Sequence, residues 1–209
     1  MRLANFMVGA ALITFTACSN PDNTPLPIVG NTVIVNGDTI YHQIADFRFI
    51  NQDSQWVDNA TFAGKVYVAD FFFTSCPTIC PKVTRQMLRL YEHYAPDNRI
   101  LFLSHSIDVR RDTVERLKEY ATGLGVTSDR WHFVTGDHDQ IYEMADDYFS
   151  TALVDTDAPG GFDHSGLLIL VDENRHVRSF CDGTNEEEVN RLMMDIDKLL
   201  RQEYSSRLD

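Results

Sequence analysis

The sequence predicts a single α/β domain behind an N-terminal export segment. Three observations support this prediction. Apolar runs typical of buried strands alternate with amphipathic helical stretches, a hairpin signal precedes them, and a length of 209 residues suits one domain with extensions. Apolar residues make up 44% of the chain and charged residues 23%, which excludes a disordered chain, a collagen-like repeat and a small disulfide scaffold.

The predicted elements begin with a small hairpin. Residues 32–35 and 38–41 flank Asn36-Gly37, a dipeptide favoured where both central residues of a tight turn adopt positive φ. A second short strand is expected at 47–50, paired with Trp56-Val57. The domain is therefore expected to carry an N-terminal β-hairpin extension.

Strands and helices then alternate along the rest of the chain. Residues 66–73 are almost continuously apolar or β-forming, which indicates a strand buried on both faces. Asp112 is expected to cap a helix that Gly125 ends. The remaining apolar patterns predict helices at 81–94, 112–124, from Asp137 or Asp139 onward and at 189–200, and strands at 99–106, 131–135, 167–171 and 176–181. This order predicts a sheet with helices on both faces.

The charge balance restricts the kinds of partner. The chain has 18 Lys and Arg against 31 Asp and Glu, a formal net charge of −13. A nucleic-acid-binding protein needs a basic face to contact phosphates, so nucleic acid is not an expected partner. Acidity alone identifies no other partner.

Residues 1–17 are expected to be a lipoprotein signal peptide. Arg2 is their only charge, and the apolar run at 6–15 has the length of a signal h-region, too short to span a bilayer. Phe15-Thr16-Ala17-Cys18 resembles the bacterial lipobox, with Phe where Leu is usual. That resemblance implies a lipidated Cys18; the alternative is an ordinary signal peptide with a chance cysteine.

The rest of the chain is divided accordingly. Residues 18–31 are expected to be the lipidated cysteine and a flexible tether rich in proline and asparagine, and residues 32–209 the folded domain. No later run reaches 18 apolar residues, so the mature chain is not expected to span a membrane. The expected location is the bacterial cell envelope, on the periplasmic side and held by the lipid.

The most informative segment joins a predicted strand to a predicted helix. Cys76 and Cys80 lie four residues apart there, and Pro77 and Pro81 suit a first helical turn. A helix N-terminus stabilises thiolate, and residues four apart share a helical face, so both sulfurs are expected to point toward one place. The alternative is a purely structural disulfide between the two cysteines, although a disulfide that closes a five-residue loop adds little stability.

Three segments together resemble the Sco/SenC family of copper-binding, thioredoxin-like proteins. The first is residues 72–81 with the two cysteines. The second is residues 106–113, an Asp loop running into Arg-Asp-Thr, and the third is Asp163-His164-Ser165 before a strand. The similarity covers roughly residues 45–200. It implies a thioredoxin-like fold and a role in building the binuclear copper centre of cytochrome c oxidase.

The resemblance also implies the ligands. Carried over by position, they are Cys76, Cys80 and His164, binding Cu(I) or Cu(II). Thiolates select Cu(I) and an added imidazole allows Cu(II), so the residue chemistry agrees. The implied acceptor is the copper-site subunit of cytochrome c oxidase, with a copper donor chaperone as a further partner. The other six histidines lack a matching context and are expected to be structural or exposed.

Several carboxylates are candidates for supporting roles. Asp108, Asp112 and Asp163 belong to the matching motifs; the alternative role of Asp112 is that of a helix cap, and the sequence does not show the direction of Asp163. Asp70 lies inside an apolar strand six residues before Cys76, as a buried Asp does in thioredoxins. It either reaches solvent at a strand edge or lies beneath the cysteines with a raised pKa.

Three functions therefore stay open. The leading hypothesis is a copper metallochaperone. A thiol:disulfide oxidoreductase acting through Cys76, Cys80 and Asp70 is the second, and a non-catalytic lipoprotein with a structural disulfide is the third. Cys181 is expected to be a small buried hydrophobe, or else a third redox thiol.

Overall fold

The computed structural model describes residues 24–205 of the 209-residue chain. The predicted signal peptide and Cys18 lie outside the described residues. Within the described part, a seven-stranded sheet runs in the order β11-β10-β5-β6-β7-β3-β4. Its strands are β3 (Arg48–Asn51), β4 (Trp56–Asp58), β5 (Val66–Phe72), β6 (Ile100–Ser106), β7 (Trp131–Thr135), β10 (Leu167–Val171) and β11 (Val177–Asp182).

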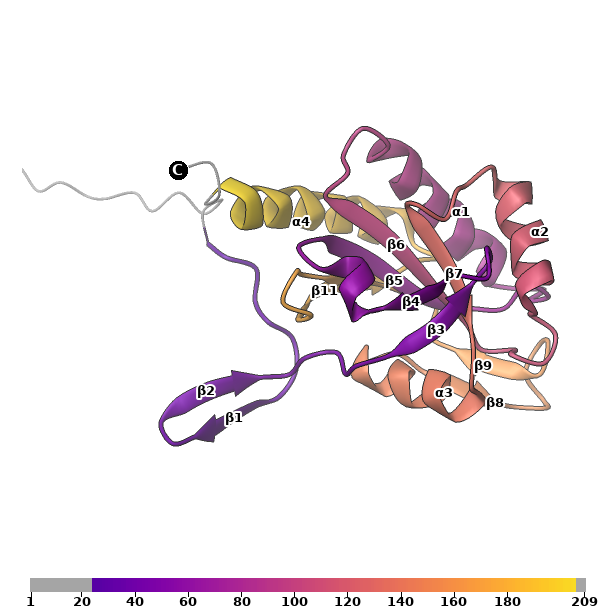
Figure 1. Cartoon of the computed structure of the whole chain (residues 1–209), viewed down its shortest axis with the longest axis horizontal. Coiled ribbons are helices and arrows are strands. Elements are labelled where there is room, and N and C mark those ends of the chain that lie inside the picture. Colours follow the sequence, from indigo (N-terminus) through magenta and orange to yellow (C-terminus); the bar gives the residue numbers. More distant parts are fainter. Residues whose placement is uncertain (1–23, 206–209) are drawn as a thin grey trace, which may run out of the picture.

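The three central strands β5, β6 and β7 are parallel, and the strands on either side of them are antiparallel. The connections β5-α1-β6 and β6-α2-β7 step in one direction across the sheet, so right-handed crossovers place both helices on the same face. Figure 1 shows α1 (Cys80–His93), α2 (Val114–Leu124) and α4 (Glu186–Ser205) on that face and α3 (His138–Asp147) on the other. The predicted α/β sheet with helices on both faces is confirmed.

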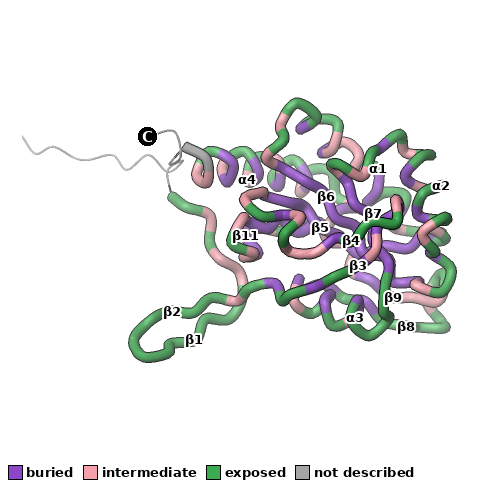
Figure 2. Tube along the Cα trace, viewed as in Figure 1, coloured by how far each residue is buried: buried purple, intermediate pink, exposed green. Residues whose placement is uncertain are grey.

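Side-chain alternation along β5 divides the core into two layers. All seven β5 residues are buried. Phe71 lies on the α3 face, where its ring contacts Tyr148, whereas Phe72 contacts Tyr120 of α2 on the opposite face. Asp70 has the same parity as Phe72 and therefore belongs to the α1–α2 layer. Figure 2 shows the buried residues concentrated along the sheet.

The N-terminal hairpin is confirmed as β1 (Thr32–Val35) and β2 (Asp38–Tyr41). Asn36 and Gly37 adopt the positive φ values of 54° and 92° that the turn requires. All eight strand residues are exposed, and the hairpin projects from the body (Figure 2).

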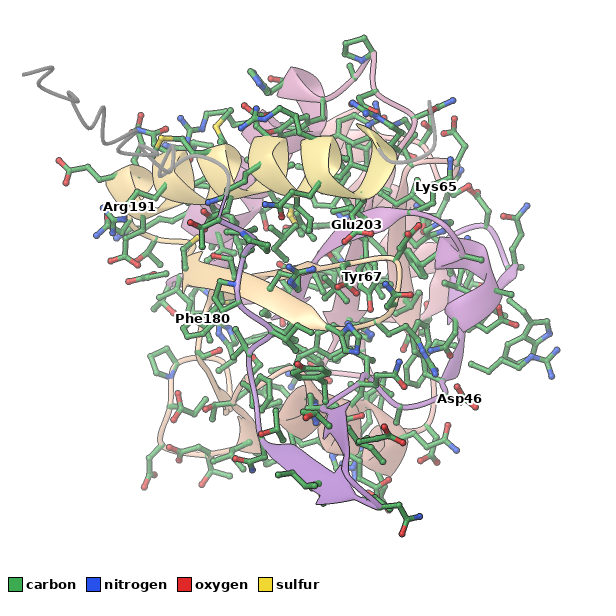
Figure 3. All side chains as sticks on the ribbon, turned by 90° about the vertical axis from the view of Figure 1, so that its left-hand side faces the viewer. Asp46, Lys65, Tyr67, Phe180, Arg191 and Glu203 are labelled. Atoms are coloured by element: carbon green, nitrogen blue, oxygen red, sulfur yellow. The ribbon has the colours of Figure 1, made fainter. Side chains whose placement is uncertain are left out.

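The predicted flexible tether is wrong for residues 26–29, which are fixed to the domain. Leu26 and Val29 pack against the core, and the Val29 N–H donates to the Val177 carbonyl at 2.8 Å. The Arg178 guanidinium donates to the carbonyls of Leu26 and Pro27, and also reaches Glu203. Figure 3 shows Glu203 between α4 and the strands. The sequence around Leu26 and Val29 did not predict this packing, because it depends on Arg178, which is distant in the sequence.

Two further local differences from the sequence prediction concern the cap of α2 and two short strands, whereas the cap of α3 is one of the two predicted. Thr113, not Asp112, caps α2, and its side chain accepts the Arg116 N–H; Gly125 ends the helix in the left-handed conformation, as predicted. Asp137 is the N-cap of α3. The sequence missed the two-stranded sheet of β8 (Ala152–Val154) and β9 (Phe162–His164). No helix within residues 24–205 is long and apolar enough to cross a membrane.

Candidate metal centre

Three side chains from two distant segments converge at the end of the central sheet. Cys76 follows β5, Cys80 opens α1, and His164 ends β9. The His164 Nε2 atom lies 3.2 Å from the Cys80 sulfur and 3.7 Å from the Cys76 sulfur. All three residues are buried, and their ligand atoms lie within 4.8 Å of one another. The structure therefore brings together the three residues that the sequence resemblance implied.

The start of α1 holds the two cysteines in register. The residue before the helix, Ile79, provides no side-chain cap, and Pro81 occupies the first turn, where no backbone donor is needed. The Cys80 N–H instead points at the Cys76 sulfur at 3.5 Å. A sulfur that accepts a helix N-terminal donor is stabilised as thiolate. The prediction holds for Pro81, but Pro77 and Cys76 precede the helix, which begins at Cys80, so the two cysteines do not share a helical face.

Asp112 braces the cysteine loop from the next strand–helix junction. Its carboxylate is fully buried and accepts three hydrogen bonds: from the Thr74 N–H at 2.9 Å, the Thr74 hydroxyl at 2.6 Å and the Ser106 hydroxyl at 2.6 Å. The Arg116 guanidinium donates to the Thr74 hydroxyl at 3.1 Å. The expected role as a helix cap is wrong, because this long-range network engages the carboxylate and leaves the cap to Thr113.

Sequence reasoning missed Thr74 and Ser106 as parts of the site. Thr74 lies two residues before Cys76 and is tied to Asp112 by both its backbone and its hydroxyl. Ser106 ends β6, directly beside the end of β5. The one available signal was that both residues sit in the two segments matching the family motifs.

His164 is held chiefly by aromatic packing. Its ring lies edge-on to Phe73, and Phe162 packs on the same phenyl ring with centroids 5.0 Å apart. Gly160 lies so close to Phe73 that an added Cβ would come within 2.7 Å of the ring. Burial lowers the pKa of His164, and its Nδ1 atom has no partner among the described residues. A neutral imidazole with Nε2 toward the sulfurs is the form that binds metal.

The two thiols have opposite tendencies to ionise. Burial opposes ionisation of Cys76, but donors from Thr78 and Cys80 outweigh it and lower the pKa of this thiol. Burial raises the pKa of the Cys80 thiol, and the charges of Cys76 and Asp70 add to that effect. Cys76 is therefore the more readily ionised of the two thiols, and burial favours the protonated form of Cys80.

Asp70 is buried, so it does not reach solvent at a strand edge. Burial raises its pKa to about 7, against the effect of a hydrogen bond from Ser104. The Ser104 hydroxyl in turn accepts from the indole N–H of Trp131 at 2.8 Å, and the Asp70 Oδ1 atom has no partner among the described residues. Asp70 lies in the same layer as α1, and its charge adds to the effects that raise the pKa of the Cys80 thiol. A carboxyl with this pKa can exchange a proton near neutral pH.

The other predicted supporting residues do not contact the three ligands. Asp108 is buried and pairs with Arg111 at 3.2 Å, beside the site rather than in it. Asp163 is exposed, and no hydrogen bond joins it to His164. Cys181 is buried in β11, where burial raises the pKa of its thiol to about 12, as expected for a small hydrophobe.

The remaining histidines are structural or exposed, as expected. His105 and His132 are buried, and His93 and His138 are exposed. His42 and His176 are half-buried; the His42 Nε2 atom lies 2.8 Å from the Asp147 carbonyl, and the His176 Nδ1 atom lies 3.4 Å from the buried Asp172 carboxylate. None of them joins a metal-binding group among residues 24–205.

The donor set fits one soft metal ion. Bonds from sulfur and imidazole nitrogen to such ions are roughly 2.0–2.3 Å long, so three ligands around one ion lie roughly 3.5–4 Å apart. The separations in the structure fall around this range. Two thiolates with one neutral imidazole suit Cu(I) and also accommodate Cu(II) or zinc, whereas hard cations prefer oxygen ligands.

The fold and this cluster define the class: a thioredoxin-like protein that carries a buried dithiol–imidazole centre. The chain belongs to the SCO1/SenC family, whose family model matches residues 38–201. The SCO1 protein homolog of Bacillus subtilis is 28% identical over 161 residues, which cover 76% of this chain and 83% of that protein.

Solved structures agree with the family and the fold. A SCO1/SenC family lipoprotein from Bacillus anthracis superposes with a TM-score of 0.68 at 29% identity, covering 76% of this chain and 95% of that one. BsSco, described as a member of the Sco family of cytochrome c oxidase assembly proteins, gives 0.64 at 29%, covering 76% and 93%. Copper-bound ScoI of Arabidopsis thaliana shares the fold at 23% identity, with a TM-score of 0.63 and coverage of 76% and 98%.

Proposed function

We propose that this protein is a copper metallochaperone that delivers copper to, or matures, the binuclear copper site of cytochrome c oxidase. The observation that supports the proposal is the convergence of the Cys76 and Cys80 sulfurs with the His164 Nε2 atom. Copper is the cargo because two thiolates favour Cu(I) and the imidazole extends the site to Cu(II). Family membership and the described role of BsSco support the oxidase as the destination.

The remaining parts of the proposal concern location and partners. A lipid on Cys18 would hold the domain at the bacterial cell envelope on its periplasmic side, in keeping with the lipoprotein from Bacillus anthracis. The acceptor is the copper-site subunit of the oxidase, and a donor chaperone supplies the copper.

The test is copper stoichiometry and spectroscopy on the reduced domain. A chain beginning at Thr24 is suitable because it retains the docked segment at Leu26 and the whole core. We expect one Cu(I) per chain and, with Cu(II), a thiolate charge-transfer band. His164→Ala is expected to abolish that band and weaken binding, whereas His93→Ala, which changes an exposed histidine on α1, leaves both unchanged. If His164→Ala has no effect on either property, the ligand set is wrong.

A second candidate function is thiol:disulfide oxidoreduction, favoured by the position of Asp70 and the unequal thiols. The Cys76 thiolate attacks a partner disulfide and releases one partner thiol. Cys80 then displaces the second partner thiol and forms the Cys76–Cys80 disulfide, while Asp70 takes up the Cys80 proton. The Cys76–Cys80 reduction potential, and turnover with a disulfide substrate in the presence of a dithiol that reduces the Cys76–Cys80 disulfide again, test this role. Tight copper binding without turnover rejects it.

A further inference from the structure

A groove of about 380 Å³ runs beside the two sulfurs, between α1 and α2. Its walls are largely apolar, and both sulfur-bearing residues line it. The lining used here comprises Cys76, Cys80, Pro81, Leu88, Tyr120 and Leu124. Its volume lies toward the lower end of pockets that hold small ligands, so it suits a few residues of an extended segment.

One charged side chain, Arg85, lines this groove. It is exposed and forms no hydrogen bond or ion pair with any residue in 24–205. Nearby arginines are engaged: Arg89 contacts Asn190 and Glu186, and Arg116 contacts Thr74 and Glu119. Arg85 is thus a free cation in a chain whose net charge is −13.

The groove leads to the atoms that any exchange must reach. A partner that takes a metal from two buried thiolates has to bring its own sulfur next to them, and Cys76 and Cys80 are both buried and both line this groove. An apolar channel with one cation beside reactive sulfurs matches a ligand with an apolar body, a thiol and one carboxylate.

We propose that the α1–α2 groove binds an extended segment of the copper acceptor, in which an acidic side chain beside a metal-accepting cysteine pairs with Arg85. This inference rests on the proposed function, since it names how the acceptor approaches the same site. The partner is a protein segment, and the Arg85 pair sets its orientation over the sulfurs rather than the affinity of the site for copper.

The experiment measures Cu(I) transfer from the copper-loaded chain beginning at Thr24 to two synthetic peptides. Both carry the same Cys-x-x-Cys pair in an apolar context; one has Glu and the other Lys two residues after the second cysteine. We expect transfer to the Glu peptide to be about two- to fivefold faster, the range of an exposed ion pair. Raised salt removes the difference.

Charge reversal provides the matched control. Arg85→Glu is expected to reverse the preference, so that the Lys peptide becomes the faster acceptor. Lys82→Glu makes the same charge change on α1 at a residue that does not line the groove, and the original preference should persist. Amide chemical shifts, measured with Ser-for-Cys versions of the peptides, should change along α1 and α2.

The outcomes separate this inference from the proposed function. Absence of Cu(I) binding by the unaltered chain rejects the proposed function. Normal Cu(I) binding with equal transfer rates to both peptides, or with shift changes away from α1 and α2, overturns the groove proposal alone. A preference that survives in Arg85→Glu also overturns it.

Discussion

The two halves of the candidate metal centre are held in different ways. The cysteine half lies between β5 and α1, where Asp112 accepts three hydrogen bonds from the loop and from β6. The histidine half lies on β9, a three-residue strand that pairs with β8 alone. Leu153 and Val154 of that small sheet are exposed, and His164 is positioned by its contact with Phe73 rather than by a hydrogen bond at Nδ1.

This difference indicates that the two cysteines and the histidine have different roles in the candidate site. The sulfurs form a fixed platform, because their loop is tied to the central sheet by buried polar groups. The imidazole is the adjustable ligand, since a short peripheral sheet can shift with little loss of core packing. The proposed copper carrier has to hold the ion and also release it, and one adjustable ligand out of three would allow it to do both.

The largest expected effect is the removal of a platform ligand. Cys80→Ser should lower the affinity for Cu(I) by more than about 100-fold, beyond the 10- to 100-fold effects typical of supporting partners. His164→Ala should cost less for Cu(I), because two thiolates remain, although it removes the Cu(II) site. Competition titration with a Cu(I) chelator measures both variants. Equal losses of Cu(I) affinity would contradict the division between platform and adjustable ligand.

The next largest effect is expected from Asp112, whose hydrogen bonds hold the cysteine loop. Asp112→Ala leaves the Thr74 N–H, the Thr74 hydroxyl and the Ser106 hydroxyl without their acceptor. We expect a loss of roughly 2–4 kcal/mol in the free energy of unfolding, together with a weaker and broader Cu(II)–thiolate band. Urea denaturation and absorption spectra provide the measurements.

A neighbouring residue supplies the control for this brace. Thr113→Ala removes the actual helix cap of α2 and should cost about 1 kcal/mol without changing the spectrum. If Asp112→Ala is as mild as Thr113→Ala, or leaves the spectrum unchanged, Asp112 does not position the cysteine loop.

The hydrogen bonds of Asp112 also show which features could not be predicted from the sequence. Alternating apolar runs and the Asn36-Gly37 turn were sufficient for the main sheet, the helices and the hairpin, because local patterns set those elements. Asp112 and Thr113 are both good cap residues, and the choice between them depends on Thr74, 38 residues away from Asp112. No local pattern contains that contact.

Some parts of the candidate site could likewise be predicted from the sequence, and others could not. Its ligands could be predicted because Cys76, Cys80 and His164 lie in short matching motifs, and the structure brings them together. The strands β8 and β9 were missed because three residues are too few to establish a period. The burial of Asp70 also stayed open in the sequence, since an apolar strand does not reveal what covers each face.

The next prediction concerns Asp70, which lies on the cysteine side of the candidate site. Its pKa of about 7 in the folded protein lies above its unfolded value near 3.8. Folding therefore becomes less favourable as the pH rises from about 4 to 7, and the full penalty remains above pH 7. Asp70→Asn should raise the free energy of unfolding by about 2–4 kcal/mol at pH 8 and have little effect at pH 4.

Unfolding curves at several pH values, beside the exchange rate of the dithiol, test the role of Asp70. The same variant should slow disulfide formation by Cys80, since its proton acceptor is gone, while Cu(I) affinity changes little. If the gain in stability of Asp70→Asn over the unaltered chain is no larger at pH 8 than at pH 4, Asp70 is not a buried, proton-exchanging carboxyl.

The smallest expected effect belongs to the histidine half. Asp163 is exposed and acts on His164 through its charge alone, against the larger effect of burial on the pKa of the imidazole. Asp163→Asn should therefore change the Cu(II) affinity at pH 7 by less than about threefold, as expected for an exposed charge. A carboxylate that hydrogen-bonds a ligating imidazole is instead worth 10- to 100-fold. A loss of that size would mean that β9 turns Asp163 onto the His164 Nδ1 atom when copper binds, which would make the histidine half as firmly supported as the platform.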